Sequence, residues 1–146
     1  MATYSFLDVT ASLTGPTGVI DLGQGSANSE EGITQTMGGN KNTMTIGADG
    51  EGMHSLHADK SGTITVTLLK TSPVNKKLSL AYNAQSQSSA TWGNNVIVIR
   101  NTASGDISTA RSCAFQKQPD FNNAKEGGTV AWVFDCGKID QLLGEF

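Results

Sequence analysis

Apolar and polar residues alternate most regularly between Ser61 and Lys70, where three aliphatic side chains are separated by threonines. A period of two with many β-branched residues predicts a β-strand that has one face in the core and one face in solvent. Shorter apolar runs bounded by Gly, Pro, Asn and Ser predict further strands on both sides of it. These lie at Tyr4–Leu13, Val19–Leu22, Val96–Arg100, Ile107–Gln118 and Thr129–Gly137, with a turn at Gly15-Pro16-Thr17-Gly18 between the first two.

A helical spacing replaces this alternation after Ser72-Pro73. Serine is a favourable N-cap and proline is tolerated at the first helical position, so a helix is expected at about residues 73–88. Its polar side carries Lys76 and Lys77, and the pattern indicates a surface helix with one packed side. The residues expected on the packed side are Val74, Leu78, Ala81, Tyr82 and Gln85.

The segment between these strands is poor in large apolar residues. Two short alternating runs, Ile33–Met37 and Asn42–Ile46, are separated by Gly38-Gly39-Asn40-Lys41 and predict a hairpin with a polar, Gly-rich tip. Residues 23–32 read as an exposed loop, and Gly47–Gly52 reads as a mobile acidic stretch. Because this region has little to bury, we do not expect it to lie deep in its own subunit.

The order of strands, one helix and further strands disfavours a parallel sheet with helical crossovers. The expected fold is mainly β, a small β-sandwich or barrel with one flanking helix and a long extended loop or hairpin. The chain has 146 residues with 16% charged and 6% aromatic residues, a composition typical of β-rich proteins, and one domain over residues 1–146 is expected.

The charge and the hydropathy of the chain exclude some partners. A formal net charge of −3 argues against tight nucleic-acid binding, which depends on Lys and Arg displacing phosphate counterions. The sequence has no apolar run long enough for a membrane-spanning helix and no signal-peptide pattern at its start. We therefore expect no membrane insertion and a cytoplasmic site of synthesis and assembly.

Cys113 and Cys136 both fall in expected strands. In a cytoplasmic protein, buried thiols that pack as small apolar groups are the expected state. A disulfide is the alternative, if the last two strands form one hairpin centred near Asn123–Ala124. That register places Cys113 opposite Cys136 and Phe115 opposite Phe134.

His54, His57 and Asp59 form the one ligand-like cluster in the sequence. On an extended strand the two histidines point to opposite faces and cannot chelate one ion, and a stable metal site needs at least a third ligand. The chain has no Gly-x-Ser-x-Gly elbow and no phosphate-binding loop, and its carboxylates are scattered. No catalytic, cofactor-binding or metal-binding residue is predicted, and an enzyme acting through the histidine cluster is the less favoured reading.

The run from Met53 to Asn75, MHSLHADKSGTITVTLLKTSPVN, closely resembles the tail-tube proteins of contractile-tailed bacteriophages, which are related to bacteriocin and type VI secretion tubes. The resemblance implies a structural virion protein that forms stacked hexameric rings around a lumen for DNA. It also implies contacts with the tail sheath, tape-measure, baseplate and terminator proteins. A baseplate or terminator subunit and a monomeric ligand-binding β-sandwich are the alternatives.

Under this reading two sets of residues would mediate assembly. Lys76 and Lys77 would face the sheath from the helix. Separately, the net negative charge of the chain predicts that the bore of the tube is net acidic. The residues expected to contact neighbouring subunits are Gly38, Gly39, Asn40, Lys41, Gly47, Asp49, Gly50, Glu51, His54 and His57.

Overall fold

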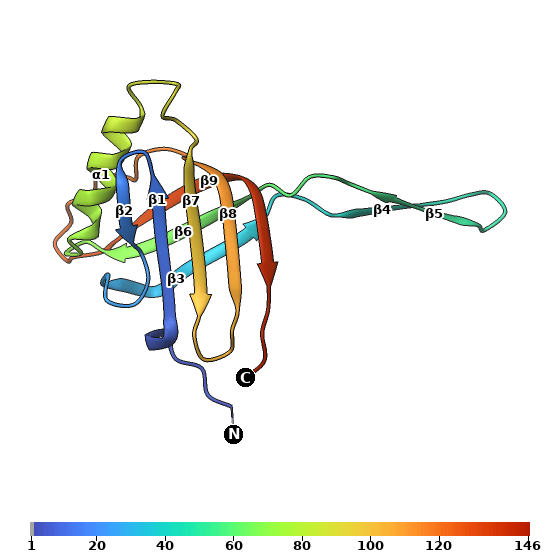
Figure 1. Cartoon of the computed structure of the whole chain (residues 1–146), viewed down its shortest axis with the longest axis horizontal. Coiled ribbons are helices and arrows are strands. Elements are labelled where there is room, and N and C mark those ends of the chain that lie inside the picture. The colour runs from blue at the N-terminus through green and yellow to red at the C-terminus, as the bar shows by residue number, and fades with distance from the viewer. Residues whose placement is uncertain (1) are drawn as a thin grey trace.

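The computed structural model describes residues 2–146 and is built mainly of antiparallel strands (Figure 1). A 3₁₀ turn at Phe6–Asp8 precedes the first strand, and one α-helix, α1 (Val74–Gln85), follows the sixth. The strands are β1 (Val9–Gly15), β2 (Gly18–Asp21), β3 (Asn28–Met37), β4 (Asn42–Ile46), β5 (Gly52–Leu56), β6 (Gly62–Leu69), β7 (Asn95–Asn101), β8 (Ile107–Phe115) and β9 (Thr129–Leu142). The predicted mainly β class with one flanking helix is confirmed.

Seven of the strands form one sheet in the order β2-β1-β7-β8-β9-β6-β3. Strand β9 joins its two parts, because the first half of β9 pairs with β6 and its second half pairs with β8. The sheet therefore bends around the core, with β3 and β6 crossing β1, β7 and β8 in Figure 1. The predicted barrel is not closed in the described residues, since β2 and β3 remain edge strands.

The core follows the alternation read from the sequence. Ile64, Val66 and Leu68 of β6 are fully buried, as the period of two predicted. Trp132 and Phe134 of β9 enter the same cluster from the neighbouring strand. On α1, the buried residues are Val74, Leu78, Ala81 and Gln85, with Tyr82 partly buried against the core, so the predicted stripe is confirmed.

Local hydrogen bonds fix both ends of α1. Helix α1 begins at Val74, with Pro73 rather than the predicted Ser72 at the N-cap position. The Ser72 hydroxyl accepts from the Val74 amide (3.3 Å) and donates to the Ser26 carbonyl (2.6 Å), which ties the start of the helix to a loop. At the other end, Gln85 and Asn95 exchange two side-chain hydrogen bonds of 2.9 and 2.7 Å. A Cβ at Gly15 would lie 2.0 Å from the side-chain oxygen Oδ1 of Asn95, so only glycine leaves room for this buried amide pair.

Several boundaries differ from the sequence-based prediction, and the helix expected at residues 73–88 ends at Gln85. Residues 23–32 were predicted as an exposed loop, but β3 begins at Asn28 and pairs with β6 through an irregular register. The buried edge of β6 provides a backbone partner that the polar sequence of this segment did not reveal. Strand β8 ends at Phe115 instead of Gln118. Strand β9 continues past Gly137 to Leu142, because it pairs first with β6 and then with β8. The segment before Val9 forms the 3₁₀ turn rather than strand.

The predicted hairpin of Ile33–Met37 with Asn42–Ile46 is wrong. Strand β3 pairs with β6, with Ile33 opposite Val66, and β4 pairs with β5 instead. The longer strand β6 offers β3 more backbone partners and apolar contacts than β4 does. Gly38–Lys41 are therefore part of the stem from which the β4–β5 hairpin projects, and the tip of that hairpin lies at residues 47–51.

Within residues 2–146, no helix combines the length and the apolar character needed to cross a membrane.

Candidate assembly surfaces

The β4–β5 hairpin projects away from the large sheet, on the side opposite α1 (Figure 1). Its two strands form a separate two-stranded sheet, and nine of their residues are exposed, with Ser55 half-buried. Two-stranded hairpins of this size are marginally stable in water on their own. A surface that covers the hairpin would therefore stabilise it.

The two faces of the hairpin differ in polarity. Residues opposite each other in the register share a face, so Met44, Ile46 and Leu56 lie together, with Asn42 and His54. The three apolar side chains are 57%, 56% and 82% exposed. We call this set, Met44, Ile46 and Leu56, the apolar hairpin face. The other face carries Thr43, Thr45 and Ser55 around Met53.

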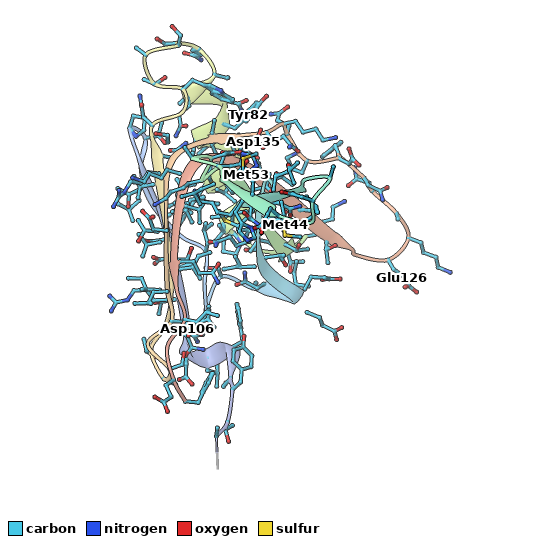
Figure 2. All side chains as sticks on the ribbon, turned by 90° about the vertical axis from the view of Figure 1, so that its right-hand side faces the viewer. Met44, Met53, Tyr82, Asp106, Glu126 and Asp135 are labelled. Atoms are coloured by element: carbon cyan, nitrogen blue, oxygen red, sulfur yellow. The ribbon has the colours of Figure 1, made fainter. Side chains whose placement is uncertain are left out.

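Figure 2 looks toward the hairpin from its free end, with Met44 and Met53 in the central region of the view. The loop that contains Glu126 and the β7–β8 end near Asp106 lie at the periphery of the same view.

The apolar residues of the hairpin were missed by the sequence-based site prediction. Their signal was the alternation of Met44 and Ile46 with Thr43 and Thr45, which marks one apolar side.

The tip and the stem of the hairpin are both defined by hydrogen bonds. At the tip, the Gly47 amide donates to the Glu51 carbonyl (2.7 Å) and the Asp49 carboxylate accepts from the Glu51 amide (3.1 Å). Gly50 has a φ of 90°, which favours glycine. The predicted mobile stretch is thus an ordered turn with two acidic residues. At the stem, the His57 amide donates to the Lys41 carbonyl (2.9 Å).

The two histidines have different hydrogen-bond partners on strand β4. His54 Nδ1 lies 3.1 Å from the side-chain nitrogen Nδ2 of Asn42, and His57 Nε2 lies 2.7 Å from the Thr43 hydroxyl. Asp59 accepts from the Ser61 amide (2.8 Å), and hydrogen bonds from Ser61 lower the pKa of the Asp59 carboxyl. In the described part of the chain, no group of three or more His, Cys, Asp or Glu residues is arranged to hold a metal ion.

Helix α1 and the loop at residues 116–128 form a second exposed surface. Lys76 and Lys77 are exposed on α1, and Leu80 beside them is 60% exposed. Lys76 lines a groove of about 720 Å³ between α1 and the loop, with Trp132 at its base and Phe121 on its rim. The predicted lysine pair therefore lies on a surface that combines positive charge with exposed apolar side chains.

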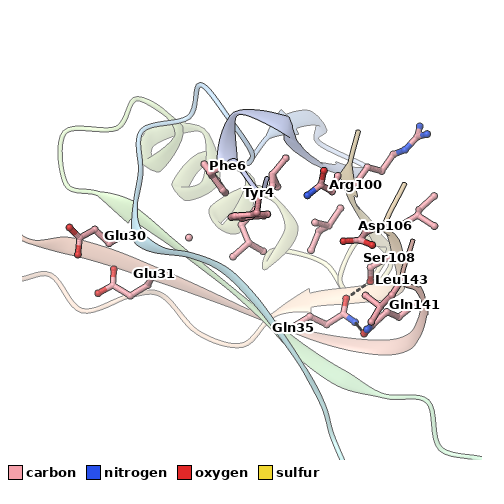
Figure 3. Close-up of a pocket in the computed structure, with 16 residues that line it drawn as sticks. Tyr4, Phe6, Glu30, Glu31, Gln35, Arg100, Asp106, Ser108, Gln141 and Leu143 are labelled. Carbon is pink, nitrogen blue, oxygen red and sulfur yellow. Dashed lines mark hydrogen bonds between the residues drawn. The ribbon is translucent and has the colours of Figure 1, made fainter. Parts of the chain in front are cut away.

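A third surface feature is a groove of about 560 Å³ between the N-terminal segment, β3 and the ends of β7 and β8 (Figure 3). Inside it, Gln35 Nε2 donates to Gln141 Oε1 (2.9 Å) and the Ser108 hydroxyl donates to Gln35 Oε1. Ser108 is thus bonded to an amide oxygen rather than to a base. These contacts link β3 to β8 and β9 across the open side of the sheet, which is a structural role.

The whole fold is similar to that of proteins from contractile injection systems. A chain from the sheath–tube complex of an extracellular contractile injection system, PVC, in the extended state is 12% identical, with a TM-score of 0.58 over 97% of this chain and 92% of that one. The sheath/tube terminator of the same system has 12% identity and a TM-score of 0.56, with coverages of 97% and 98%. The tube-terminating cap of the anti-feeding prophage has 10% identity and a TM-score of 0.54, with coverages of 99% and 95%.

The fold is thus shared with tube, terminator and cap proteins of contractile injection systems. The family model described as bacteriophage PhiTE tail tube protein matches residues 1–144, and this chain belongs to that family of phage tail tube proteins. No curated protein matches the sequence.

Proposed function

We propose that this chain is a non-enzymatic virion subunit, one tail-tube domain over residues 1–146, whose copies form stacked hexameric rings. The rings build the inner tube of a contractile tail, and DNA passes through the lumen. The observation that carries the proposal is the exposed apolar hairpin face in a chain of the tail tube family. Burial of apolar area is the main favourable term in association, and this face is exposed to solvent in the described part of the chain.

A second copy is the occupant that fits the hairpin best. A two-stranded sheet that projects from its own core gains order when it packs against the same fold in a neighbour. Edge strands β2 and β3 also leave backbone groups that a neighbouring subunit can cover. Head-to-tail contacts between different surfaces close into a ring when the rotation between copies allows it. The tip residues Asp49 and Glu51, and the stem residues Gly38–Lys41, would then lie within or beside the contact.

The lumen is proposed to be weakly repulsive for DNA. The net charge of −3 per chain supports this, because repeated copies multiply the field around a bore. The exposed face of β8 and β9 carries Arg111, but Asp140 lies 3.9 Å from it and 3.3 Å from Lys60. Asp140 thus offsets part of the positive charge that Arg111, Lys60 and the neighbouring Lys138 give this face. A reconstruction of the assembled tube should show a net acidic bore, and a bore lined mainly by Lys and Arg would contradict this part of the proposal.

The test of assembly is negative-stain electron microscopy of the purified chain over a range of concentrations. Six-fold rings or hollow tubes are expected, and their mass should increase with concentration as rings stack. Discrete monomers at every concentration would count against the proposal. The measurement needs no partner protein, because the proposed contacts are between copies of this chain.

Helix α1 is proposed to face the sheath, because it lies on the side of the fold opposite the hairpin (Figure 1). Baseplate, terminator and tape-measure proteins would complete the contacts of the tube, with assembly in the host cytoplasm. The positive charge and the exposed Leu80 on α1 favour a sheath segment that is acidic and partly apolar.

The double reversal Lys76→Glu with Lys77→Glu is expected to reduce sheath binding at least about tenfold while tubes form normally. Each exposed charge pair is worth up to about 1 kcal/mol, and reversal replaces attraction by repulsion. Sheath co-sedimentation with preformed tubes measures the effect. The matched control, Lys76→Arg with Lys77→Arg, keeps both charges and should bind as the wild type does. Unchanged sheath binding by the double glutamate variant would remove α1 as the sheath contact.

A terminator or baseplate subunit is the second candidate, since both share this fold at TM-scores of 0.56 and 0.51 with 12% identity. The two roles differ in copy number, because a tube subunit repeats along the whole tail and a cap does not. Quantitative mass spectrometry of purified particles separates them. A copy number matching one ring would assign the chain to the end of the tube.

A further inference from the structure

The two cysteines lie opposite each other on adjacent core strands. Cys113 of β8 pairs with Cys136 of β9, and Phe115 pairs with Phe134, as the predicted hairpin register placed them. Both thiols are buried and free, and their sulfur atoms are 2.9 Å apart. A disulfide bond is about 2.05 Å long, so bond formation requires the sulfurs to approach by less than about 1 Å.

The pair also occupies the corner of the bent sheet. Ala110 of β8 and Ile139 of β9 form one buried pair, and Cys113 and Cys136 form the next. The two pairs are three residues apart on each strand, whereas a regular strand would separate them by two. Between them Ser112 has a φ of 53°, and β8 has an extra residue relative to β7. A covalent bond here would link β8 to β9 beside the point where the sheet bends around the core.

We infer that Cys113 and Cys136 form an oxidation site, at which a small peroxide converts the buried thiol pair into an intrachain disulfide. Cys136 attacks one peroxide oxygen, the O–O bond breaks, and Cys136 becomes a sulfenic acid while the other oxygen leaves as water. The sulfur of Cys113 then attacks the sulfenic sulfur, the S–O bond breaks, and the second oxygen leaves as water. The balance is two thiols and one H₂O₂ giving one disulfide and two waters.

The order of the two steps follows from the hydrogen bond between the thiols. The Cys113 thiol donates to the Cys136 sulfur, which lowers the pKa of Cys136 and raises the pKa of Cys113. Burial and the nearby Asp135 carboxylate oppose the lowering at Cys136. Cys136 is therefore the first nucleophile and Cys113 is the resolving thiol. Because both are buried, a molecule as small as hydrogen peroxide fits the site better than a bulky disulfide reagent.

The consequence rests on the proposed function, since a tail particle leaves a reducing cytoplasm for an oxidising exterior. Subunits would fold and assemble with thiols and gain a cross-link afterwards. The cross-link constrains the unfolded chain over the loop between the two strands, which raises the melting temperature without changing the folded surface. The tube would thus become more resistant to unfolding after release, while its assembly contacts stay the same.

The test treats the purified wild-type chain with hydrogen peroxide under native conditions. Both thiols should disappear from a thiol titration in denaturant, peptide mass spectrometry should find Cys113 linked to Cys136, and Tm should rise by about 10 °C. The double variant Cys113→Ala with Cys136→Ala is the control for methionine oxidation and should show no such rise. Cys113→Ser keeps a hydrogen-bond donor and should leave Cys136 as a sulfenic acid, which dimedone labels when the treated protein is unfolded in its presence.

Two free thiols after treatment, or overoxidation to sulfinic acid without a disulfide, would overturn the inference. A dimedone adduct at Cys113 in a Cys136→Ser variant, with none at Cys136 in Cys113→Ser, would overturn the order of steps. The chemistry is measured on dissolved protein, so it fails or succeeds independently of tube formation. Rings or tubes seen by microscopy without a disulfide would keep the proposed function and reject only the oxidation site.

Discussion

Glutamate at all three positions of the apolar hairpin face, Met44→Glu, Ile46→Glu and Leu56→Glu, is expected to abolish ring and tube formation. The subunit itself should keep its fold, because each side chain is more than half exposed and exposed substitutions usually change the free energy of unfolding by less than about 0.5 kcal/mol. An unpaired carboxylate buried in a subunit contact costs several kcal/mol, and three of them should reduce assembly by more than about a hundredfold.

Sedimentation and negative-stain microscopy measure assembly, and thermal unfolding reports on the fold. Leu80→Glu is the matched control, since Leu80 is as exposed as the hairpin residues but lies on α1. It should leave tube formation unchanged. A second variant removes residues 42–56 and joins Lys41 to His57 through a short glycine linker. The Lys41 carbonyl already accepts from the His57 amide, so the join requires little movement.

Normal tubes from the triple glutamate variant would exclude the apolar hairpin face as a subunit contact. Loss of tubes together with a large fall in Tm would mean that the hairpin supports the fold, in which case the deletion variant should unfold as easily. The two readouts therefore separate an assembly role from a folding role. A loss of tubes with Leu80→Glu as well would indicate that α1 also lies between subunits.

Elements whose contacts are close in sequence were predictable. The alternation on β6 identified its buried face, and the spacing of Val74, Leu78 and Ala81 identified the buried side of α1. The β8–β9 register followed from centring one loop, which correctly placed Cys113 opposite Cys136. For β6 and α1 one periodic pattern carried the information, and for β8 and β9 the position of one loop did.

Elements decided by competition between distant strands were not predictable. The short run Ile33–Met37 is compatible with two partners, and the sequence near it favours the closer one, β4. The structure pairs it with β6, which lies further along the chain but has a longer edge. Local turn signals cannot weigh that choice, because the decisive contacts, such as Ile33 opposite Val66, span the whole hairpin insertion.

The candidate site shows the same division. Sequence reasoning predicted subunit contacts within residues 38–57, and it emphasised glycines and histidines that serve the stem, the turn and local hydrogen bonds. The exposed apolar residues Met44 and Leu56 were missed, because a sequence alone does not tell an unsupported strand from a buried one. Exposure in the folded subunit is what makes them candidates for a contact surface.

Phe115→Ala is expected to be the most destabilising single change, costing about 3 to 5 kcal/mol of unfolding free energy. Phe115 is the centre of the aromatic cluster that joins α1 to the sheet. Its ring centroid lies 5.5 Å from that of Tyr82 on α1, 5.9 Å from that of Trp132 and 4.9 Å from that of Phe134. Truncation leaves a cavity among rings from separate elements, and neighbours held by their own strands can close it only in part.

Urea unfolding of the unassembled chain, followed by tryptophan fluorescence, measures this cost, because Trp92 and Trp132 both lie beside the Phe115 ring. A fall in Tm of about 10 to 15 °C should accompany it. Phe121→Ala is the matched control: the side chain is 93% exposed, so the same truncation should change stability by less than about 0.5 kcal/mol. A cost below about 1 kcal/mol for Phe115→Ala would show that α1 is held mainly by other contacts, the buried Gln85–Asn95 amide pair first among them.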